Sequence, residues 1–245
     1  MSWQQRWLDR YYDPAKGWRH GTDKFFAMIA QRTPRGGRIL EIGAGPSNQT
    51  SRFLAGLGQV HGLDPDPDVA SNDALASWAL MEGPRYPFDD GAFDICVSNY
   101  VIEHVEDAQA HLVEISRVLA PGGAYLFRTP NFFHYVGLAA HFTPHSFHLQ
   151  VANRLRDAPE DSHDPYPTMY RLNTRRAIRR SAAAAGFTVE QLSMVESEPM
   201  YGLSNRALFL LFMAYERVVN CSEIFAGLRV NILGSLGKHP TTESV

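Results

Sequence analysis

The stretch RILEIGAGPSN, residues 38–48, decides how the rest of the sequence is interpreted. It begins as a short apolar run, which predicts a strand buried on both faces, and then turns through Gly43, Ala44 and Gly45. Glycine at such a turn lets the backbone approach a ligand closely because glycine has no Cβ. Glu41, just before the turn, would repel a pyrophosphate and attract a cation. The stretch therefore predicts a nucleotide-like cofactor with positive charge, and an ordinary structural turn is the open alternative.

Strands and helices alternate along the chain around this stretch. The patterns predict strands near residues 38–44, 59–64, 78–83, 92–99, 124–130, 188–196 and 228–236. They predict helices near residues 47–57, 68–77, 108–119, 173–187 and 203–219. Asp107 is a candidate N-cap, and Pro121, Gly122 and Gly123 are expected to stop the helix that it begins. Such alternation predicts an α/β fold with a doubly wound, mostly parallel sheet.

We expect residues 1–245 to form a single domain, because the sequence contains no repeat, low-complexity segment or linker. Its expected parts are a helical cap (1–35), a cofactor-binding core (36–130), an insertion (131–172) and the rest of the sheet (173–245). The insertion is rich in His, Phe, Tyr and Pro and has no clear period. Because it follows the fifth strand, we expect it to fold over the site as a lid that carries the acceptor pocket.

Composition excludes several classes of protein. With 245 residues, 44% hydrophobic content and a net charge of -3, the chain can bury a core and lacks a broad basic face for nucleic acid. Cys96 and Cys221 cannot form a disulfide framework or a zinc cluster by themselves. The N-terminus lacks the apolar segment of a secretory signal, and the longest apolar run, residues 207–215, is far short of about 20 residues. We expect a cytoplasmic protein. The apolar run is expected to be buried, with a homodimer face or the mouth of a lipid-binding site as alternatives.

Two further residues bear on which cofactor is bound. Asp64 ends the second strand, where a carboxylate can accept hydrogen bonds from two ribose hydroxyls. Asn48 stands where the dinucleotide fingerprint has its third glycine, which weakens an interpretation as an NAD site. A cationic ligand with a ribose is S-adenosyl-L-methionine.

Four motifs, in this order and spacing, carry a family resemblance: RILEIGAG, GLD, PFDDGAFDICVSNYVIEHVED and LAPGGAYLFRTPN. Residues 36–130 resemble the class I S-adenosylmethionine-dependent methyltransferases, in their small-molecule, type 11-like branch. The resemblance implies a Rossmann-like, seven-stranded sheet whose last strand is antiparallel. It also implies S-adenosyl-L-methionine as the cofactor and S-adenosyl-L-homocysteine as the product.

The resemblance implies a set of cofactor-binding residues: Glu41, Gly43, Ala44 and Gly45 for the methionine part, Asp64 for the ribose, Glu82 and Gly83 for the adenine, and Asn99 and Tyr100 for the methionine end. Glu82 departs from the Asp that the family commonly has. Upstream, Arg19 resembles a residue of the segment that closes over the cofactor and could bind its carboxylate bidentately. A surface arginine without this role is the open alternative.

Methyl transfer requires alignment and exclusion of water, and it needs a general base only when the acceptor must lose a proton. His104, between the fourth strand and Asp107, is the best-placed candidate base; ordering the loop is its alternative role. His134 and Tyr170 are further catalytic candidates, and Tyr135, His145 and Arg171 are candidates for binding the acceptor. A structural role stays open for each. We expect no metal, because no cysteine or tight carboxylate cluster accompanies the histidines.

The sequence thus predicts an enzyme that transfers a methyl group to a small-molecule acceptor, at oxygen, in bacterial secondary or cell-envelope metabolism. The preference for oxygen rests on the histidines available for deprotonation. The alternatives are an N-methyltransferase, an NAD(P)-dependent oxidoreductase and a non-catalytic, cofactor-binding scaffold.

Overall fold

The computed structural model describes residues 2–135, 137–138, 167–199 and 205–240. The chain divides into two compact units. The sheet unit comprises Phe25–Thr129, Thr168–Ser193 and Ile232–Val245, and the helical unit comprises Met1–Lys24, Pro130–Pro167 and Met194–Asn231. Each unit is described by itself.

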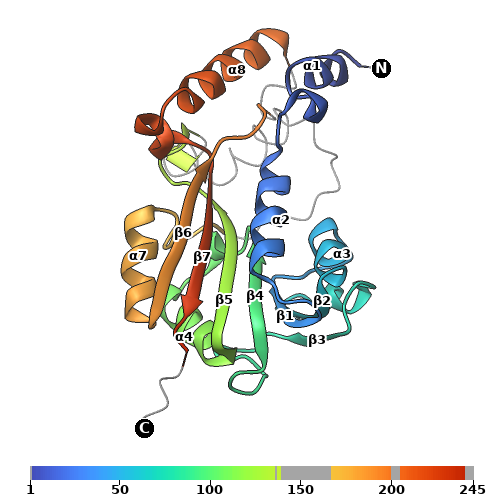
Figure 1. Ribbon diagram of the computed structural model, residues 1–245, viewed down its shortest axis with the longest axis vertical. Helices are drawn as coiled ribbons and strands as arrows, with labels where there is room; N and C mark the ends of the chain where they lie inside the picture. Colours follow the sequence, from blue (N-terminus) through green and yellow to red (C-terminus); the bar gives the residue numbers. More distant parts are fainter. Residues whose placement is uncertain (1, 136, 139–166, 200–204, 241–245) are drawn as a thin grey trace. The chain divides into compact units, whose positions relative to one another are not determined.

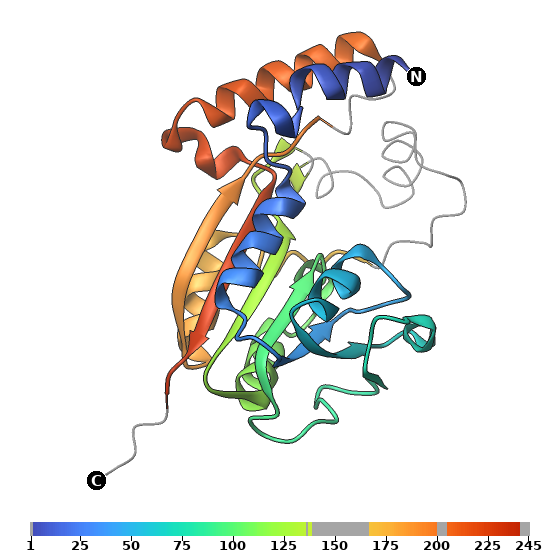
Figure 2. The ribbon, with the colours of Figure 1, turned by 45° about the vertical axis from the view of Figure 1, so that its right-hand side comes forward.

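The sheet unit is built on a seven-stranded sheet with the strand order β3-β2-β1-β4-β5-β7-β6 (Figure 1). Its strands are β1 (Gly37–Ile42), β2 (Gly58–Asp64), β3 (Ser77–Leu80), β4 (Phe93–Asn99), β5 (Leu119–Pro130), β6 (Phe187–Val195) and β7 (Asn231–Lys238). The pairs β1–β2, β1–β4, β2–β3 and β4–β5 are parallel. Figures 1 and 2 show β7 running against its neighbours. The predicted doubly wound, mostly parallel sheet is therefore confirmed.

The sheet reverses its order between β1 and β4, and this reversal positions the site. From β1 the chain builds β2 and β3 toward one edge, and it then returns to build β4 and β5 on the other side of β1. In the register, Ile42 pairs with both Leu63 and Ser98, so β1, β2 and β4 end at the same level. Open α/β sheets bind ligands at the carboxyl ends of the strands beside such a reversal.

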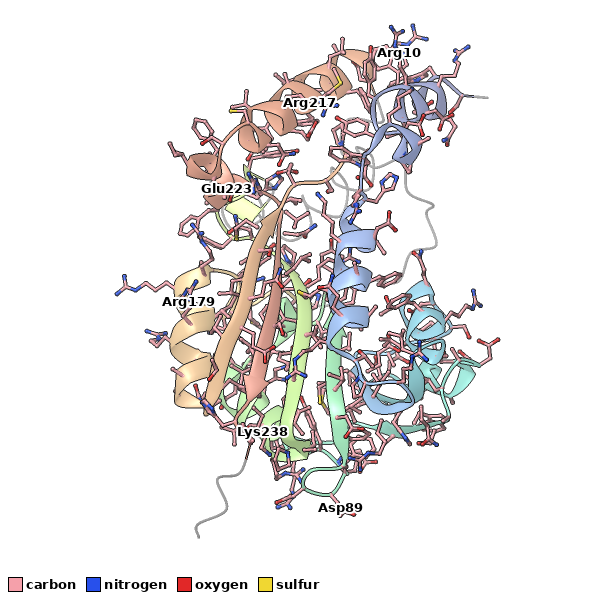
Figure 3. All side chains as sticks on the ribbon, viewed as in Figure 1. Arg10, Asp89, Arg179, Arg217, Glu223 and Lys238 are labelled. Atoms are coloured by element: carbon pink, nitrogen blue, oxygen red, sulfur yellow. The ribbon has the colours of Figure 1, made fainter. Side chains whose placement is uncertain are left out.

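Helices cover both faces of the sheet. They are α3 (Gln49–Ala55), α4 (Ala108–Val118), α7 (Arg175–Ala184) and, from Phe25 onward, α2 (Gly21–Arg32). Figure 2 shows α2 in front of the sheet and α4 and α7 behind it, where these two pack against each other. The arginines of α7 are exposed, and Figure 3 shows Arg179 projecting away from the sheet. Buried Ile178 and Ala182 occupy the opposite, sheet-facing side of α7.

Both ends of α4 lie where the sequence predicts them. Asp107 is its N-cap, as predicted, and accepts hydrogen bonds from the backbone N–H groups of Gln109 at 3.0 Å and Ala110 at 2.9 Å. Helix α4 ends at Val118 with Leu119 as its C-cap, two residues before Pro121, as the prediction of a stop at Pro121, Gly122 and Gly123 requires. These three residues lie within β5, where its pairing with β4 is irregular. A shift in the β4–β5 register accommodates the extra residues as a bulge.

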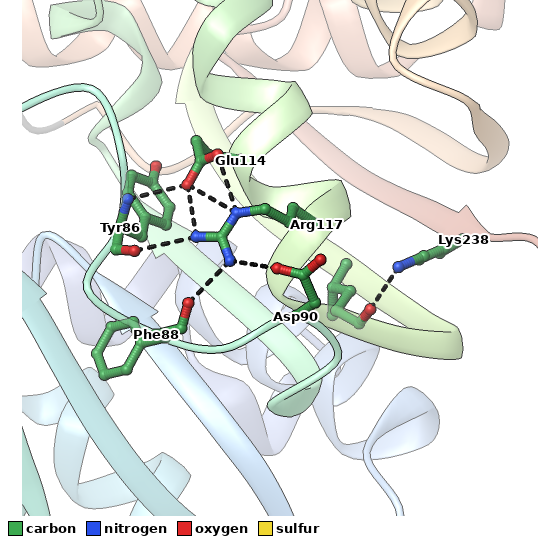
Figure 4. A network of polar contacts seen from close by, with 7 residues as sticks. Tyr86, Phe88, Asp90, Glu114, Arg117 and Lys238 are labelled. Carbon is green, nitrogen blue, oxygen red and sulfur yellow. Dashed lines mark hydrogen bonds and ion pairs between the residues drawn. The ribbon is translucent and has the colours of Figure 1, made fainter.

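A polar cluster around Arg117 fixes the loop between β3 and β4 to α4 (Figure 4). The Arg117 guanidinium donates to the carbonyl oxygens of Phe88 at 2.8 Å and Tyr86 at 3.0 Å and contacts Asp90 at 2.7 Å. Glu114 pairs with the same guanidinium at 2.7 Å, which lowers the pKa of the Glu114 carboxyl. These contacts replace the regular structure that the loop lacks.

The helical unit contains α1 (Trp3–Tyr11), the 3₁₀ turn η1 (Pro14–Lys16), α8 (Arg206–Asn220) and the 3₁₀ turn η5 (Glu223–Leu228). Buried Tyr12 and Phe209 form its aromatic core with Trp3, Trp7 and Trp18. The expectation that residues 207–215 are buried is only partly right, because Leu210 and Leu211 are exposed. Formation of η5 also explains why the last strand begins at Asn231 rather than near residue 228. No helix in the described part of the chain has the length and apolar character needed to span a bilayer.

Candidate cofactor site

The glycine turn after β1 uses its two glycines for different reasons. Both have a left-handed backbone, with φ values of 72° at Gly43 and 52° at Gly45. A Cβ on Gly43 would lie 2.3 Å from Cγ2 of Val101, which is far inside van der Waals contact. A Cβ on Gly45 would meet no described atom within 4 Å. Gly43 is therefore needed for close packing against the loop after β4, whereas Gly45 borders open space in which a ligand can lie.

Two asparagines hold this turn in place. Asn48 caps α3 by accepting hydrogen bonds from the N–H groups of Thr50 and Ser51, and its amide donates to the Ala44 carbonyl at 2.7 Å. Asn72, which is buried, donates to the Gly45 carbonyl at 3.1 Å and to the Ser51 hydroxyl at 2.9 Å. Asn48, which stands where the dinucleotide fingerprint has its third glycine, is therefore the N-cap of α3.

The prediction of a helix over residues 68–77 is wrong because Asn72 is used across the turn. Only a 3₁₀ turn, η2 (Pro67–Ser71), forms there, and Asn72 ends it in an extended conformation. The following β3 is correspondingly short, ending at Leu80 rather than residue 83. Sequence reasoning missed Asn72 as a site residue; the only local signal for it is an asparagine after a proline-initiated turn.

Asp64 connects the end of β2 to the glycine turn. Its Oδ2 accepts the Gly45 N–H at 2.9 Å, and its Oδ1 accepts the Asp66 N–H at 2.8 Å. An ionised carboxylate offers about four acceptor positions, so each oxygen can accept one more hydrogen bond. Asp64 can therefore shape the turn and still receive the two hydroxyls of a ribose.

Glu41 is the most unusual acid of the site. Its side chain is 3% exposed, and among the described residues its Oε2 has no hydrogen-bond partner. Burial raises the pKa of the Glu41 carboxyl to about 7; a hydrogen bond from Ser51 lowers it and the nearby charge of Asp64 raises it. A buried carboxylate with an unsatisfied oxygen is unfavourable unless a cationic donor joins it. The residues at this turn thus fit a cofactor with an ammonium and a sulfonium.

The remaining predicted cofactor residues of the sheet unit lie just after β3 and at the end of β4. Glu82 and Gly83 are exposed after β3. Asn99 is used within the protein: its amide donates to Thr50 Oγ1 at 2.9 Å, and its Oδ1 accepts from Arg128 Nε at 2.7 Å. Tyr100 is 40% exposed, and the Arg128 guanidinium lies 4.5 Å from the centre of its ring. Its φ of 59° is uncommon for a tyrosine, and such conformations concentrate at functional sites.

The segments that carry His104 and Tyr170 are joined by a backbone hydrogen bond near the end of β4. His104 ends the 3₁₀ turn η3 (Ile102–His104), which follows β4, and it is partly exposed. The backbone N–H of Tyr170 donates to the carbonyl of Glu103, the residue before His104, at 3.2 Å. Arg171 is exposed and instead borders a surface hollow of about 820 Å³ that Asp107 and Arg180 also line.

The other predicted residues lie outside the sheet unit. Arg19, exposed before α2, and His134 and Tyr135 belong to the helical unit. Burial lowers the pKa of the His134 imidazole to about 3, and its Nε2 lies 3.7 Å from Oε2 of Glu196. Tyr135 stacks on Phe212 with ring centres 5.2 Å apart. His145 lies outside the described residues. The roles proposed for these four residues, and the lid, stay predictions.

The two glycines make a matched pair of tests. Gly43→Ala is expected to destabilise the fold by roughly 1–3 kcal/mol, because the new methyl group overlaps Val101 and the backbone is left-handed. Gly45→Ala places alanine in a left-handed backbone but creates no clash. It is therefore expected to lower the free energy of unfolding by about 1 kcal/mol and to weaken cofactor binding. Urea unfolding and calorimetric titration of S-adenosylmethionine measure the two effects. A Gly43→Ala variant as stable as Gly45→Ala would contradict the packing argument.

Three features define the class of this protein: the sheet order, the reversal between β1 and β4, and the acid–glycine turn. They are those of proteins with the Rossmann-like methyltransferase fold. Similarity to known proteins supports this assignment. Residues 40–127 match the sequence model of the methyltransferase domain family. Over these residues the chain is similar to the class I S-adenosylmethionine-dependent methyltransferases of the type 11 branch. The family and the fold imply S-adenosylmethionine as the cofactor.

Sequence relatives share about half of their length with this chain. An uncharacterized methyltransferase of Mycobacterium sp. (strain JLS) is 33% identical over 126 residues, which are 45% of this chain and 48% of the relative. An uncharacterized methyltransferase of Mycobacterium tuberculosis (strain H37Rv) is 34% identical over 125 residues, 45% of this chain and 49% of the relative. The chain thus spans about half the length of the curated relatives it matches.

Solved structures extend the likeness in fold to most of the chain. An S-adenosylmethionine-dependent methyltransferase from Mesorhizobium loti has a TM-score of 0.55 and 15% identity, covering 88% of this chain and 97% of the other. The cyclase SpnF has a TM-score of 0.56 and 18% identity, covering 89% of this chain and 81% of the other. One fold can therefore host different chemistry, so the activity must be argued from the site.

Proposed function

We propose that this protein is an S-adenosylmethionine-dependent methyltransferase that methylates a small-molecule acceptor at oxygen. The observation that carries the proposal is the buried Glu41 carboxyl, whose Oε2 has no partner among the described residues, beside the glycine turn and Asp64. A pyrophosphate would be repelled by these two acids, whereas a cationic cofactor with a ribose satisfies both.

In this proposal each residue of the turn has a distinct task. When bound, S-adenosylmethionine supplies a methyl group already activated by its sulfonium. Glu41 attracts the cationic end of the cofactor, Asp64 accepts hydrogen bonds from the ribose, and Gly45 leaves room beside the backbone. Glu82 and Gly83 are assigned to the adenine, and Asn99 holds the end of β4 in place through Thr50 and Arg128.

The acceptor side supports oxygen as the nucleophile. A hydroxyl must lose its proton as it attacks, so it benefits from a base held close to it. His104 is partly exposed next to the strand ends, and histidine is the side chain that most often acts as a general base. The backbone N–H of Tyr170 is bonded to the carbonyl of Glu103, the residue before His104. The mycobacterial relatives support a role in bacterial metabolism, and we assign it to secondary or cell-envelope biosynthesis.

Transfer of a labelled methyl group tests the proposal. Purified protein is incubated with methyl-labelled S-adenosylmethionine and with matched hydroxyl and amine acceptors on the same ring or chain. We expect label on the hydroxyl compounds. We expect His104→Ala to lower turnover by about 10²–10⁴-fold, the usual contribution of a general base, and to leave cofactor affinity unchanged.

Each other outcome selects a different function. Label confined to amines would replace oxygen by nitrogen as the nucleophile. Tight cofactor binding without transfer to any acceptor would indicate a non-catalytic scaffold. Tight binding of NAD(H) with no response to S-adenosylmethionine would indicate an oxidoreductase.

A further inference from the structure

Three segments of the sheet unit meet at the buried side chain of Glu103. Thr129, at the end of β5, donates its hydroxyl to Oε2 of Glu103 at 3.0 Å. Asn173, just before α7, donates its amide to Thr129 Oγ1 at 2.7 Å. Glu103 is 2% exposed, and Thr129 and Asn173 are fully buried. The chain of bonds therefore joins the turn after β4 to the end of β5 and to the segment before α7.

The main chain of Glu103 makes a second connection to the same segment. Its carbonyl oxygen accepts the N–H groups of Met169 at 2.6 Å and Tyr170 at 3.2 Å. Tyr170 has a φ of 52°, a left-handed conformation that its own side chain disfavours. Such a conformation persists only where the surroundings impose it, and here the surroundings include both bonds to Glu103.

We propose that Glu103 is a positioning residue for methyl transfer, which holds Tyr170 beside His104 and so shapes the face that receives the acceptor. Through Thr129 and Asn173 its side chain fixes the approach of the segment before α7, and through its carbonyl it fixes Tyr170 directly. This inference rests on the proposed function, because it assigns the acceptor to the side of the site formed by His104 and Tyr170.

The presence of a buried acid at position 103 supports a positioning role for this residue. A buried carboxyl is costly, and an apolar side chain of similar volume would often be neutral or more stabilising. Burial raises the pKa of the Glu103 carboxyl to about 7, while the bond from Thr129 and the charge of Arg128 lower it. What the carboxyl provides is a directional acceptor for Thr129, which an apolar residue lacks.

Thr129→Val and Thr129→Ser form the matched test. Valine keeps the shape but removes the hydroxyl that joins Glu103 to Asn173, whereas serine keeps the hydroxyl. With the acceptor identified by the labelled-methyl experiment, we expect Thr129→Val to lower kcat at least tenfold while the Kd for S-adenosylmethionine stays within twofold. We expect Thr129→Ser to retain kcat within threefold. Equal kcat in the two variants, or a matching loss of cofactor affinity in Thr129→Val, would overturn the proposal.

Two further measurements keep the test decisive. If Thr129→Val does not fold, Glu103→Met replaces it, because methionine has a similar volume and lacks an oxygen that accepts the Thr129 hydroxyl; wild-type kcat in that variant overturns the proposal. Hydrogen exchange of the Met169 and Tyr170 amides needs neither cofactor nor acceptor. Equal protection in Thr129→Val and Thr129→Ser overturns the link itself. A wild-type protein that protects these amides but binds no S-adenosylmethionine overturns the proposed function instead.

Discussion

Replacing Glu41 with glutamine is expected to stabilise the folded chain and to weaken cofactor binding at the same time. In the folded protein, burial raises the pKa of this carboxyl from 4.5 to about 7. Between these values the folded state holds a proton that the unfolded state has released, so the stability falls as pH rises. Above pH 7 the carboxyl is ionised in both the folded and the unfolded state. Burying the charge then lowers the free energy of unfolding by roughly 3 kcal/mol. Glutamine removes that cost.

Urea unfolding at two pH values measures the effect. At pH 8, Glu41→Gln should be more stable than the wild type by roughly 2–3 kcal/mol, and the difference should shrink toward zero at pH 4. Glu106→Gln, at an exposed position, is the matched control and should change little at either pH. No gain at pH 8 would contradict the argument that Glu41 is buried without compensation.

The affinity for the cofactor should depend on pH in the opposite sense to the stability. A cationic cofactor favours the ionised form of Glu41, so the wild-type affinity for S-adenosylmethionine should fall as pH drops through about 7. The steepest fall expected from one group is about tenfold per pH unit. Glu41→Gln should bind more weakly at pH 8 and lose this component of the pH dependence. Calorimetric titration at pH 6, 7 and 8 measures both.

Asp64→Ala is expected to have the largest effect on the cofactor. It removes the acceptor for the ribose, which should weaken binding by about 1.5–3 kcal/mol, the range for a charge-assisted hydrogen bond. It also leaves the N–H groups of Gly45 and Asp66 without their acceptor, so the fold should lose about 1–3 kcal/mol. The stability and cofactor affinity of Asp64→Asn should lie between those of the wild type and Asp64→Ala, because the single carbonyl oxygen of asparagine can replace only one of the two acceptor oxygens.

Calorimetry with S-adenosylmethionine and urea unfolding separate these two effects. Asp68→Asn, on the exposed turn that follows, controls for the loss of negative charge near the site. An Asp64→Ala variant with wild-type affinity would show that the ribose is bound elsewhere.

The parts of the fold that were predicted correctly depend on local signals. The apolar segments along the sequence predict the strands and their order. Asp107 predicts the helix cap, and Gly43 and Gly45 predict the turn after β1. The position of Glu41 before the turn also indicates its preference for a cation. Its unpartnered oxygen adds to that argument a property that only the folded environment can create.

The features that were missed depend on contacts between distant residues. Asn72 ends its turn because it bonds to Gly45, 27 positions away in the chain. Thr129 is 26 positions from Glu103 and 44 from Asn173, so no local pattern marks the three as neighbours. The left-handed backbone of Tyr100 and Tyr170 was unforeseen as well, because tyrosine gives no signal for a conformation that the surroundings impose.

A crystal structure of the protein with S-adenosyl-L-homocysteine tests the central claim most directly. The account predicts the ribose hydroxyls within hydrogen-bond distance of the Asp64 carboxylate and the ammonium group on the Glu41 side of the Gly43–Gly45 turn. Ligand density away from this turn, with Asp64 bonded only to Gly45 and Asp66, would contradict the account.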